Sequence, residues 1–256
     1  MADPRVTLTA LSGIPLVEPG DDLAAILADA LRASAIEPRD GDILVVAQKI
    51  VSKAEDRYVE LAGVSPSSRA LELAGILKKD PRLVEVILRE SREVVRHREG
   101  LLIVEHRLGY VMANGGVDQS NIAHGPKGER VLLLPEEPDR SCAALKARLD
   151  AEFEANLAII INDSFGRPWR NGVVGVAIGA AGLPCVVSIV GTPDLFGRPL
   201  QVTEVALADE VAAAASMLMG QSAEARPAVH VRGIRSGAAP GRAADLVRPR
   251  AQDLFR

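Results

Sequence analysis

Hydrophobic positions recur along this chain with two spacings, which predict alternating helices and strands. After Asp21 and Asp22, which suit a helix N-terminus, apolar residues between 23 and 31 recur three or four positions apart. Short consecutive apolar runs, typical of buried strands, occupy residues 43–47, 101–105, 110–113 and 157–161.

Proline, glycine and hydroxyl residues predict where further elements begin and end. Helices are expected after Ser65-Pro66, after Asp80-Pro81 and over residues 141–154. A strand is expected over 184–190, and a long alanine-rich helix over 204–219, capped by Thr203 and ended by Gly220.

Helical and strand segments alternate without a strict βαβ rhythm. This order predicts an α/β protein with mixed, α+β-like sheets in two intimately packed subdomains. We expect residues 1–233 to form this domain, with a subdomain boundary that the pattern does not locate. Residues 234–256 are rich in Gly, Ala, Pro and Arg and lack periodicity, which predicts a flexible tail.

Composition excludes several classes of protein. The chain has 256 residues, of which 48% are apolar and 25% charged, as in ordinary soluble globular proteins. A net charge of −4 and only 3% aromatic residues argue against a nucleic-acid partner. No apolar run reaches the roughly 20 residues of a membrane span. With two distant cysteines and no apolar signal core after Met1, we expect a cytoplasmic protein without membrane contact.

Two predicted acidic turns carry the candidate chemistry, and each follows a predicted buried strand. Residues 114–121 contain Asp118, and residues 162–170 contain Asp163. Ligands of open α/β sheets usually bind at strand ends, so the two carboxylates can share a hard divalent cation. Basic residues for phosphate oxygens are Lys53, Arg167 and Arg170. An Asx turn or helix cap explains Asp163-Ser164 equally well, and salt bridges explain the arginines equally well.

Familiar nucleotide and hydrolase motifs are absent. The sequence has no P-loop, no Gly-x-Gly-x-x-Gly after the first strand, no kinase signature, no Gly-x-Ser-x-Gly and no His-Glu-x-x-His. The four histidines do not fall at metal-ligand spacing, and only His124, close to Asp118, is a minor candidate for substrate contact. Trp169 can stack on a ring, although a lone tryptophan is more often buried.

An ordered set of segments resembles the coenzyme F(420):L-glutamate ligase family over residues 12–233. The segments that carry the resemblance are Ser12-Gly-Ile-Pro15, Ile50-Val-Ser-Lys-Ala-Glu55, Gly115-Gly-Val-Asp-Gln-Ser-Asn121, Asn162-Asp-Ser-Phe-Gly-Arg-Pro-Trp-Arg170, the glycine-rich stretch 172–182 and Leu218-Met-Gly-Gln221. The resemblance implies a GTP-dependent γ-glutamyl ligase and an intertwined homodimer.

The resemblance also implies site residues. Nucleotide contacts fall on Ser12, Gly13, Ile14, Pro15, Gln48, Lys49, Lys53, Asn121, Met219, Gly220, Gln221, Ser222, Ala223, Glu224, Ala225 and Arg226. Metal positions fall on Asp118, Asp163, Ser164 and Gln221, and catalytic roles on Asp163 and Lys53. The metal is expected to be Mg²⁺ or Mn²⁺, with two ions bound, and K⁺ is a further candidate ion.

One residue departs from the family pattern, and the role of two glycines is left open. Gln221 is neutral where some relatives place glutamate, so a second metal would be held more weakly unless Glu224 compensates. Gly175 and Gly179 either make room for substrate or allow close packing.

The expected reaction joins L-glutamate, and then further γ-linked glutamates, to a carboxylate of the deazaflavin F(420)-0 through an acyl phosphate. The substrates would be GTP, L-glutamate and the deazaflavin. Three alternatives remain: a γ-glutamyl ligase acting on a folate-like or other carboxylate, a catalytically silent nucleotide-binding regulator, and a metal-dependent nucleotide hydrolase.

Overall fold

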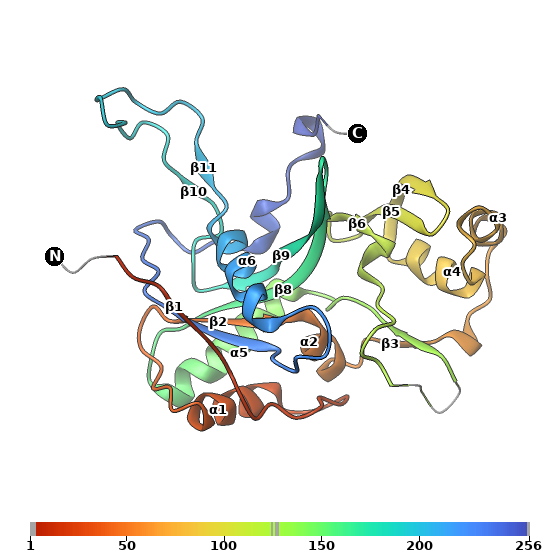
Figure 1. Cartoon of the computed structure of the whole chain (residues 1–256), viewed down its shortest axis with the longest axis horizontal. Helices are drawn as coiled ribbons and strands as arrows, with labels where there is room; N and C mark the ends of the chain where they lie inside the picture. The colour runs from red at the N-terminus through yellow and green to blue at the C-terminus, as the bar shows by residue number, and fades with distance from the viewer. Residues whose placement is uncertain (1–3, 124, 126–127, 255–256) are drawn as a thin grey trace.

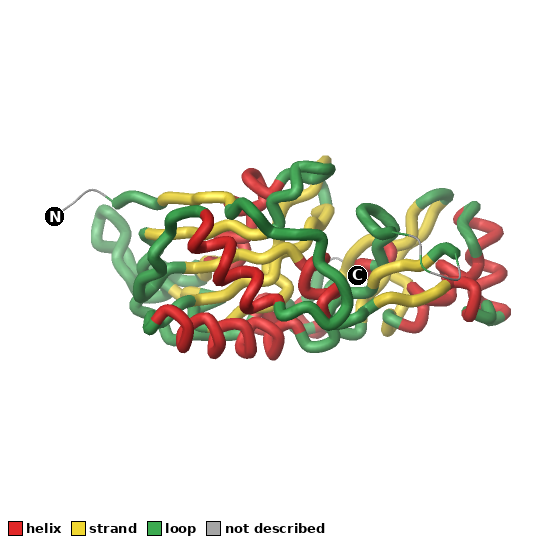
Figure 2. The backbone as a smooth tube through the Cα atoms, turned by 90° about the horizontal axis from the view of Figure 1, so that it is seen from below, coloured by secondary structure: helices red, strands yellow, loops and turns green. Residues whose placement is uncertain are grey.

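The protein folds into two lobes that lie side by side along its longest axis (Figures 1 and 2). The computed structural model describes residues 4–123, 125 and 128–254. His124, the minor substrate candidate, lies outside the described residues. The fold is of the α/β class with mixed sheets, as the sequence predicts.

A five-stranded sheet forms the centre of the larger lobe. Its order is β1-β12-β2-β8-β9, and only the β2–β8 pair is parallel. The strands are β1 (Thr7–Ala10), β12 (Ala228–Arg232), β2 (Ile43–Ala47), β8 (Ala158–Arg167) and β9 (Arg170–Ala181). Side chains alternate along a strand, so Leu44 and Val46 enter one hydrophobic core, and Ile43 and Val45 the other.

Helices cover both faces of this sheet. The first core packs the sheet against α1 (Leu23–Ala33), α2 (Gln48–Ala54) and α5 (Pro138–Phe153). The second core packs it against α6 (Leu207–Met219), whose alanines allow a close approach. Asp22 caps α1 by accepting a hydrogen bond from Ala25 N at 3.1 Å, as the sequence predicts.

The smaller lobe, residues 58–133, has a separate hydrophobic core. It contains the antiparallel pair β3 (Tyr58–Glu60) and β7 (Arg130–Leu132), and the sheet β4 (Ser91–Arg98), β5 (Leu101–His106) and β6 (Val111–Ala113). The 3₁₀ turns η1 (Leu61–Gly63) and η2 (Asn114–Gly116) lie beside them. Helices α3 (Ser68–Leu77) and α4 (Pro81–Arg89) pack against these strands, and Asp80 caps α4 with Pro81 at its first position.

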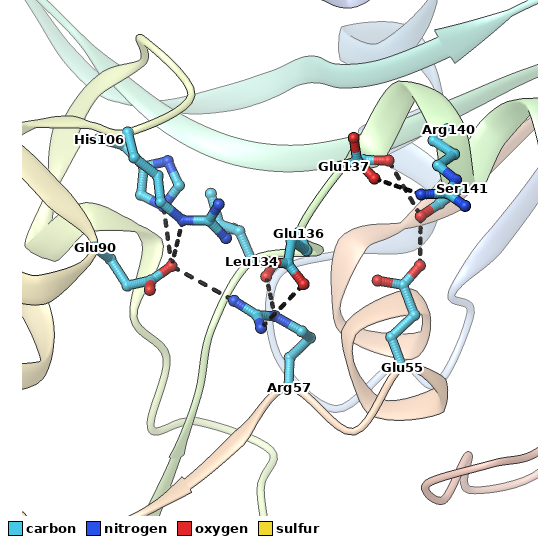
Figure 3. A network of polar contacts seen from close by, with 10 residues as sticks. Glu55, Arg57, Glu90, His106, Leu134, Glu136, Glu137, Arg140 and Ser141 are labelled. Atoms are coloured by element: carbon cyan, nitrogen blue, oxygen red, sulfur yellow. Dashed lines mark hydrogen bonds and ion pairs between the residues drawn. The ribbon is translucent and has the colours of Figure 1, made fainter.

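Polar contacts join the lobes, and Figure 3 shows those around Arg57 and Glu90. The guanidinium of Arg57 donates from Nε to Leu134 O at 3.0 Å and lies 3.6 Å from Glu90 Oε2. Glu90 also accepts from Arg107 Nε at 3.0 Å. From the smaller lobe, the Tyr110 hydroxyl donates to the carbonyl of Ile178 on β9 at 2.6 Å.

A long arm, residues 186–206, leaves the larger lobe (Figure 1). At its base Val187–Ser188 (β10) pairs with Glu204–Val205 (β11). The strand predicted over 184–190 is therefore shorter than expected. The predicted helix over 204–219 begins at Leu207 instead, because residues 204–205 pair with β10, and Thr203 does not cap it.

Residues 234–254 pack along the larger lobe and reach the smaller one. Ala243, in the 3₁₀ turn η3 (Ala243–Leu246), is buried, and its N–H donates to Asp139 at 2.9 Å. Arg250, in η4 (Arg250–Gln252), pairs with Glu105 Oε2 at 3.1 Å and Glu93 Oε2 at 3.0 Å. In this structure these contacts tie the last described residues to β4 and β5.

Several predicted boundaries are wrong for local reasons. Ser67, not Ser65, caps α3 and accepts from Ala70 N at 3.2 Å. Helix α5 begins three residues before the predicted Ser141, because Pro138 suits a first helical position. Residues 162–167 are not a turn but continue β8, which pairs with β9 as far as Arg167. The turn falls at Pro168 and Trp169, and Trp169 is 87% exposed rather than buried.

Candidate functional site

A cleft of about 790 Å³ opens where the two lobes meet. Six segments line it: residues 14–17, the start of α2, residues 118–122 of the smaller lobe, the middle of β8, Val173 of β9, and residues 219–227 at the end of α6 and after it. The predicted site residues that line it are Ile14, Pro15, Gln48, Lys49, Lys53, Asp118, Asn121, Asp163, Ser164, Met219, Gly220, Gln221, Ser222, Ala223, Glu224, Ala225 and Arg226. Segments far apart in sequence thus share one cavity.

Asp118 is held rigidly by backbone and side-chain contacts. Its N–H donates to Leu132 O at 2.9 Å, and its carbonyl accepts from Leu132 N at 3.0 Å. Its carboxylate lies 3.0 Å from Lys49 Nζ and accepts from Ser120 Oγ at 3.1 Å. Lys49 also donates to Ser120 Oγ at 2.8 Å, so these three side chains form one polar cluster in the cleft.

Asp163 lies on the facing wall, on β8 of the larger lobe. Burial, reinforced by the nearby charge of Asp118, raises the pKa of Asp163 to about 7, while a hydrogen bond from Ser164 N at 2.8 Å and the charge of Lys49 oppose this rise. The two carboxylates, 45 positions apart in the sequence, are therefore close enough for the charge of Asp118 to act on the carboxyl group of Asp163. Such coupling favours a bound cation between them.

The start of α2 presents polar side chains to the cleft because β2 runs directly into this helix. Gln48 donates weakly to Asp118 Oδ2 at 3.4 Å and is oriented by Ser52 Oγ, which donates to Gln48 Oε1 at 2.9 Å. Lys53, one turn later, donates to Asn121 O at 3.0 Å. Burial lowers the pKa of Lys53.

The donor set fits a hard divalent cation. Asp118 and Asp163 supply carboxylates, Ser164 a hydroxyl and Gln221 an amide oxygen, all in the same cleft. Ser164 Oγ lies 2.9 Å from Gln221 Oε1, which brings both neutral oxygens together. Within the described part of the chain, three or more His, Cys, Asp or Glu side chains do not gather as a metal-binding group. Other oxygen ligands would have to come from substrate or water.

Some predicted residues lie outside the cleft. Ser12 contacts Ser34 instead, through its N–H and Oγ, and Gly13 follows it with a φ of +78°. Arg167 and Arg170 do not line the cleft because the β8–β9 hairpin carries them past it. A phosphate clamp by these arginines is therefore not supported within this chain.

Close packing explains the two glycines left open by the sequence. Gly175 lies against α6, where an added Cβ would meet Ala212 O at 2.5 Å. Gly179 lies against the start of α5, where an added Cβ would meet Pro138 O at 2.6 Å. Neither residue lines the cleft.

Sequence reasoning missed residues that act through the predicted ones. Ser120 binds both Lys49 and Asp118, and Ser52 orients Gln48. Ser120 lies inside the motif around Asp118, and Ser52 lies four residues after Gln48, on the same helix face. Those spacings are the signals that could have identified them. Val173 also lines the cleft, because it pairs with Gly166 across the hairpin.

Comparison with known proteins identifies the family. The model of the F420-0:Gamma-glutamyl ligase family matches residues 13–233. The chain belongs to this family. Its members are amide-forming ligases, and the chain is an enzyme of that class.

Relatives match over nearly their whole length. "Coenzyme F420:L-glutamate ligase" of Methanothermobacter thermautotrophicus is 44% identical over 253 residues, which cover 98% of this chain and 99% of the relative. The protein of the same name from Methanopyrus kandleri is 44% identical, and the match covers 94% of this chain and 93% of the relative. The protein of the same name from Archaeoglobus fulgidus is 38% identical, and the match covers 98% of this chain and 97% of the relative. Among the described residues, no helix has the length and apolar character to span a membrane.

Proposed function

We propose that this chain is a GTP- and divalent-metal-dependent ligase that joins L-glutamate to a carboxylate of coenzyme F(420)-0 and then adds γ-linked glutamates. The observation that carries the proposal is the meeting of Asp118 and Asp163 in one cleft with Lys49 and Lys53. The family match and the names of the relatives support the acceptor and the amino acid.

Amide formation from a carboxylate requires activation because an oxide is a poor leaving group. A carboxylate oxygen of the acceptor attacks the γ-phosphorus of GTP, and the bond to the β-phosphate oxygen breaks, which releases GDP. The amine of L-glutamate then attacks the acyl phosphate, inorganic phosphate leaves, and the amine gives up a proton. No described side chain is assigned as the base for that proton.

Phosphoryl transfer depends mainly on positioning and on neutralising charge. Lys49 and Lys53, four residues apart on one face of α2, supply two cations to the phosphates. Asp118, Asp163, Ser164 and Gln221 would hold Mg²⁺ or Mn²⁺, with K⁺ as a further candidate ion. The divalent metal, when bound, neutralises phosphate charge and polarises the transferred group.

The arm suggests how a homodimer would form. At its distal end, Leu195 is 100% and Phe196 86% exposed, and Val202 is 85% exposed. Exposed apolar groups on a projecting segment favour burial against another surface. A second copy of this chain is the proposed partner. Replacing Leu195 and Phe196 by glutamate should convert a dimer into a monomer in light scattering, and an unchanged mass would contradict this role.

One assay tests the function. The protein is incubated with GTP, Mn²⁺, L-glutamate and F(420)-0, and GDP release is followed together with product mass. GDP formation that requires both acceptor and glutamate supports the ligase. GDP release without acceptor would indicate a hydrolase, and GTP binding without turnover would indicate a silent regulator. Turnover with other carboxylates but not with F(420)-0 would indicate a ligase with a different acceptor. The Asp163→Ala variant should lose at least about 100-fold in turnover while remaining folded.

A further inference from the structure

The loop that follows α6 folds around its own acidic side chain. Gly220 ends the helix with a φ of +75°, and Ala225 has a φ of +53°, so the backbone turns sharply twice. Within this turn, Ser222 N donates to Glu224 Oε2 at 2.8 Å. The carboxylate also lies against Gly220, where an added Cβ would meet Glu224 Cδ at 2.2 Å.

Several backbone N–H groups converge on this carboxylate. Hydrogen bonds from the N–H groups of Ser222, Glu224 and Gln221 lower the pKa of Glu224, and the nearby charge of Arg226 lowers it slightly. Successive N–H groups that point to one centre form a concave site for an anion. The loop therefore forms an anion site, and its occupant in this structure is a side chain of the same loop.

The occupant is not required by the hydrophobic core. Glu224 is exposed and lines the cleft, so its side chain can rotate out without disturbing packed residues. Among the described residues it forms no salt bridge within 4.0 Å. The Glu224 carboxylate is held mainly by backbone N–H groups of the loop, and the same N–H groups can bind another anion.

Two successive hydrogen bonds link the loop to a lysine of the cleft. The carbonyl of Ser222 accepts from Asn121 Nδ2 at 3.0 Å, and the carbonyl of Asn121 accepts from Lys53 Nζ at 3.0 Å. Gln221, the preceding residue, lies 2.9 Å from Ser164 Oγ on the opposite wall. The loop and Lys53 thus line the same cleft.

We propose that Glu224 is an internal anion that occupies a phosphate subsite in the nucleotide-free protein and must leave this subsite before a nucleotide phosphate binds. The proposal rests on the nucleotide-binding role given above and adds a gating step to it. The binding-competent state is only the fraction of molecules in which Glu224 has rotated out, so apparent phosphate affinity falls by that fraction. If Glu224 occupies the subsite about nine-tenths of the time, its removal strengthens phosphate binding about tenfold.

A purely structural role predicts the opposite sign. If Glu224 only fixed the shape of the loop, its removal would loosen the N–H groups and weaken anion binding. The direction of the change therefore separates gating from loop support.

Isothermal titration calorimetry of the full chain, with chelator present to remove divalent metal, measures this directly. The ligands are inorganic pyrophosphate, GTP, guanosine and L-glutamate, and the variants are Glu224→Ala and Glu224→Gln. Glu210→Gln, on the exposed face of α6, controls for the loss of one negative charge. Melting temperatures verify that each variant is folded.

The gating proposal predicts about three- to tenfold tighter pyrophosphate and GTP binding by both Glu224 variants, with guanosine and the Glu210→Gln control unchanged. Unchanged or weaker pyrophosphate binding would overturn it, and so would tighter binding of L-glutamate alone. Tighter pyrophosphate binding together with no GTP binding by any protein would support the gate but refute the nucleotide-dependent function.

Discussion

The ammonium of Lys49 lies 3.0 Å from the carboxylate of Asp118, across the boundary between the two lobes. Lys49 belongs to α2 of the larger lobe and Asp118 to the smaller lobe. The charge of Lys49 also opposes the rise in the pKa of Asp163, so one ammonium acts on both carboxylates. In the absence of metal, Lys49 supplies the positive charge that the two aspartates require.

Lys49→Met should therefore strengthen Mn²⁺ binding in the absence of nucleotide. The ammonium competes with the metal for Asp118, and its removal should raise Mn²⁺ affinity about fivefold. This factor corresponds to about 1 kcal/mol, the interaction energy of two unit charges roughly 4 Å apart in water. Electron paramagnetic resonance of free Mn²⁺ measures the change. Lys53→Met is the matched control, since Lys53 donates to a carbonyl, and it should leave Mn²⁺ affinity unchanged. Weaker binding by Lys49→Met would refute the competition.

The raised pKa of Asp163 predicts a pH-dependent gain of stability from its removal. With a folded pKa of about 7, Asp163 retains its proton in the folded protein at a pH where the unfolded chain has lost it. The wild type therefore loses stability as pH rises from about 4 to about 7. Metal-free Asp163→Asn should be more stable than wild type at pH 8, by on the order of 2 kcal/mol, and indistinguishable near pH 4. Urea denaturation of both proteins at pH 4 and pH 8 measures this difference. Equal stability of the variant and the wild type at pH 8 would contradict the burial argument.

Glu90 is predicted to stabilise the junction between the lobes. The contact with His106 Nε2 at 3.5 Å and the hydrogen bond from Arg107 Nε lower its pKa from 4.5 to about 2, against the effect of burial. Because the folded pKa is depressed, this stabilisation is present above about pH 4.5 and is lost as pH falls towards 2. Glu90→Gln should lower the free energy of unfolding at pH 7 by on the order of 2 kcal/mol. Glu72→Gln, whose exposed carboxylate pairs with Arg69 at the surface, should change it little.

Gly175→Ala should destabilise the packing of β9 on α6. The new Cβ would lie 2.5 Å from both Ala212 O and Asn162 Oδ1, so strand or helix must shift. We expect a loss of about 1–3 kcal/mol in chemical denaturation. Gly166→Ala, on the same hairpin with nothing within 4 Å of its added Cβ, is the control and should be tolerated. Equal stability of the two variants would contradict the packing argument.

Local sequence patterns predicted the elements that depend on local physics. Capping by Asp22 and Asp80 and the buried strand β2 follow from nearby residues, and the structure confirms them. The continuation of β8 through Asp163 to Arg167 could not be predicted locally, because pairing with β9 creates it. The short strand at residues 204–205 likewise exists only through its pairing with β10.

The site was predicted as a list of residues but not as an arrangement. The approach of Asp118 to Lys49 depends on how the two lobes pack, which no spacing in the sequence encodes. The exclusion of Arg167 from the cleft depends on the length of the β8–β9 hairpin. The contact of Glu224 with its own loop requires positive φ at Ala225, a non-glycine residue, which the sequence does not signal.

The most direct test of the account is Mn²⁺ binding in the presence of GTP, followed by electron paramagnetic resonance on wild type, Asp118→Asn and Asp163→Asn. Asp29→Asn, an exposed aspartate on α1, is the control. If the two lobes grip one metal–nucleotide complex, each cleft variant binds Mn²⁺ at least about tenfold more weakly than wild type, and the control does not. Wild-type Mn²⁺ affinity in both cleft variants would contradict the account.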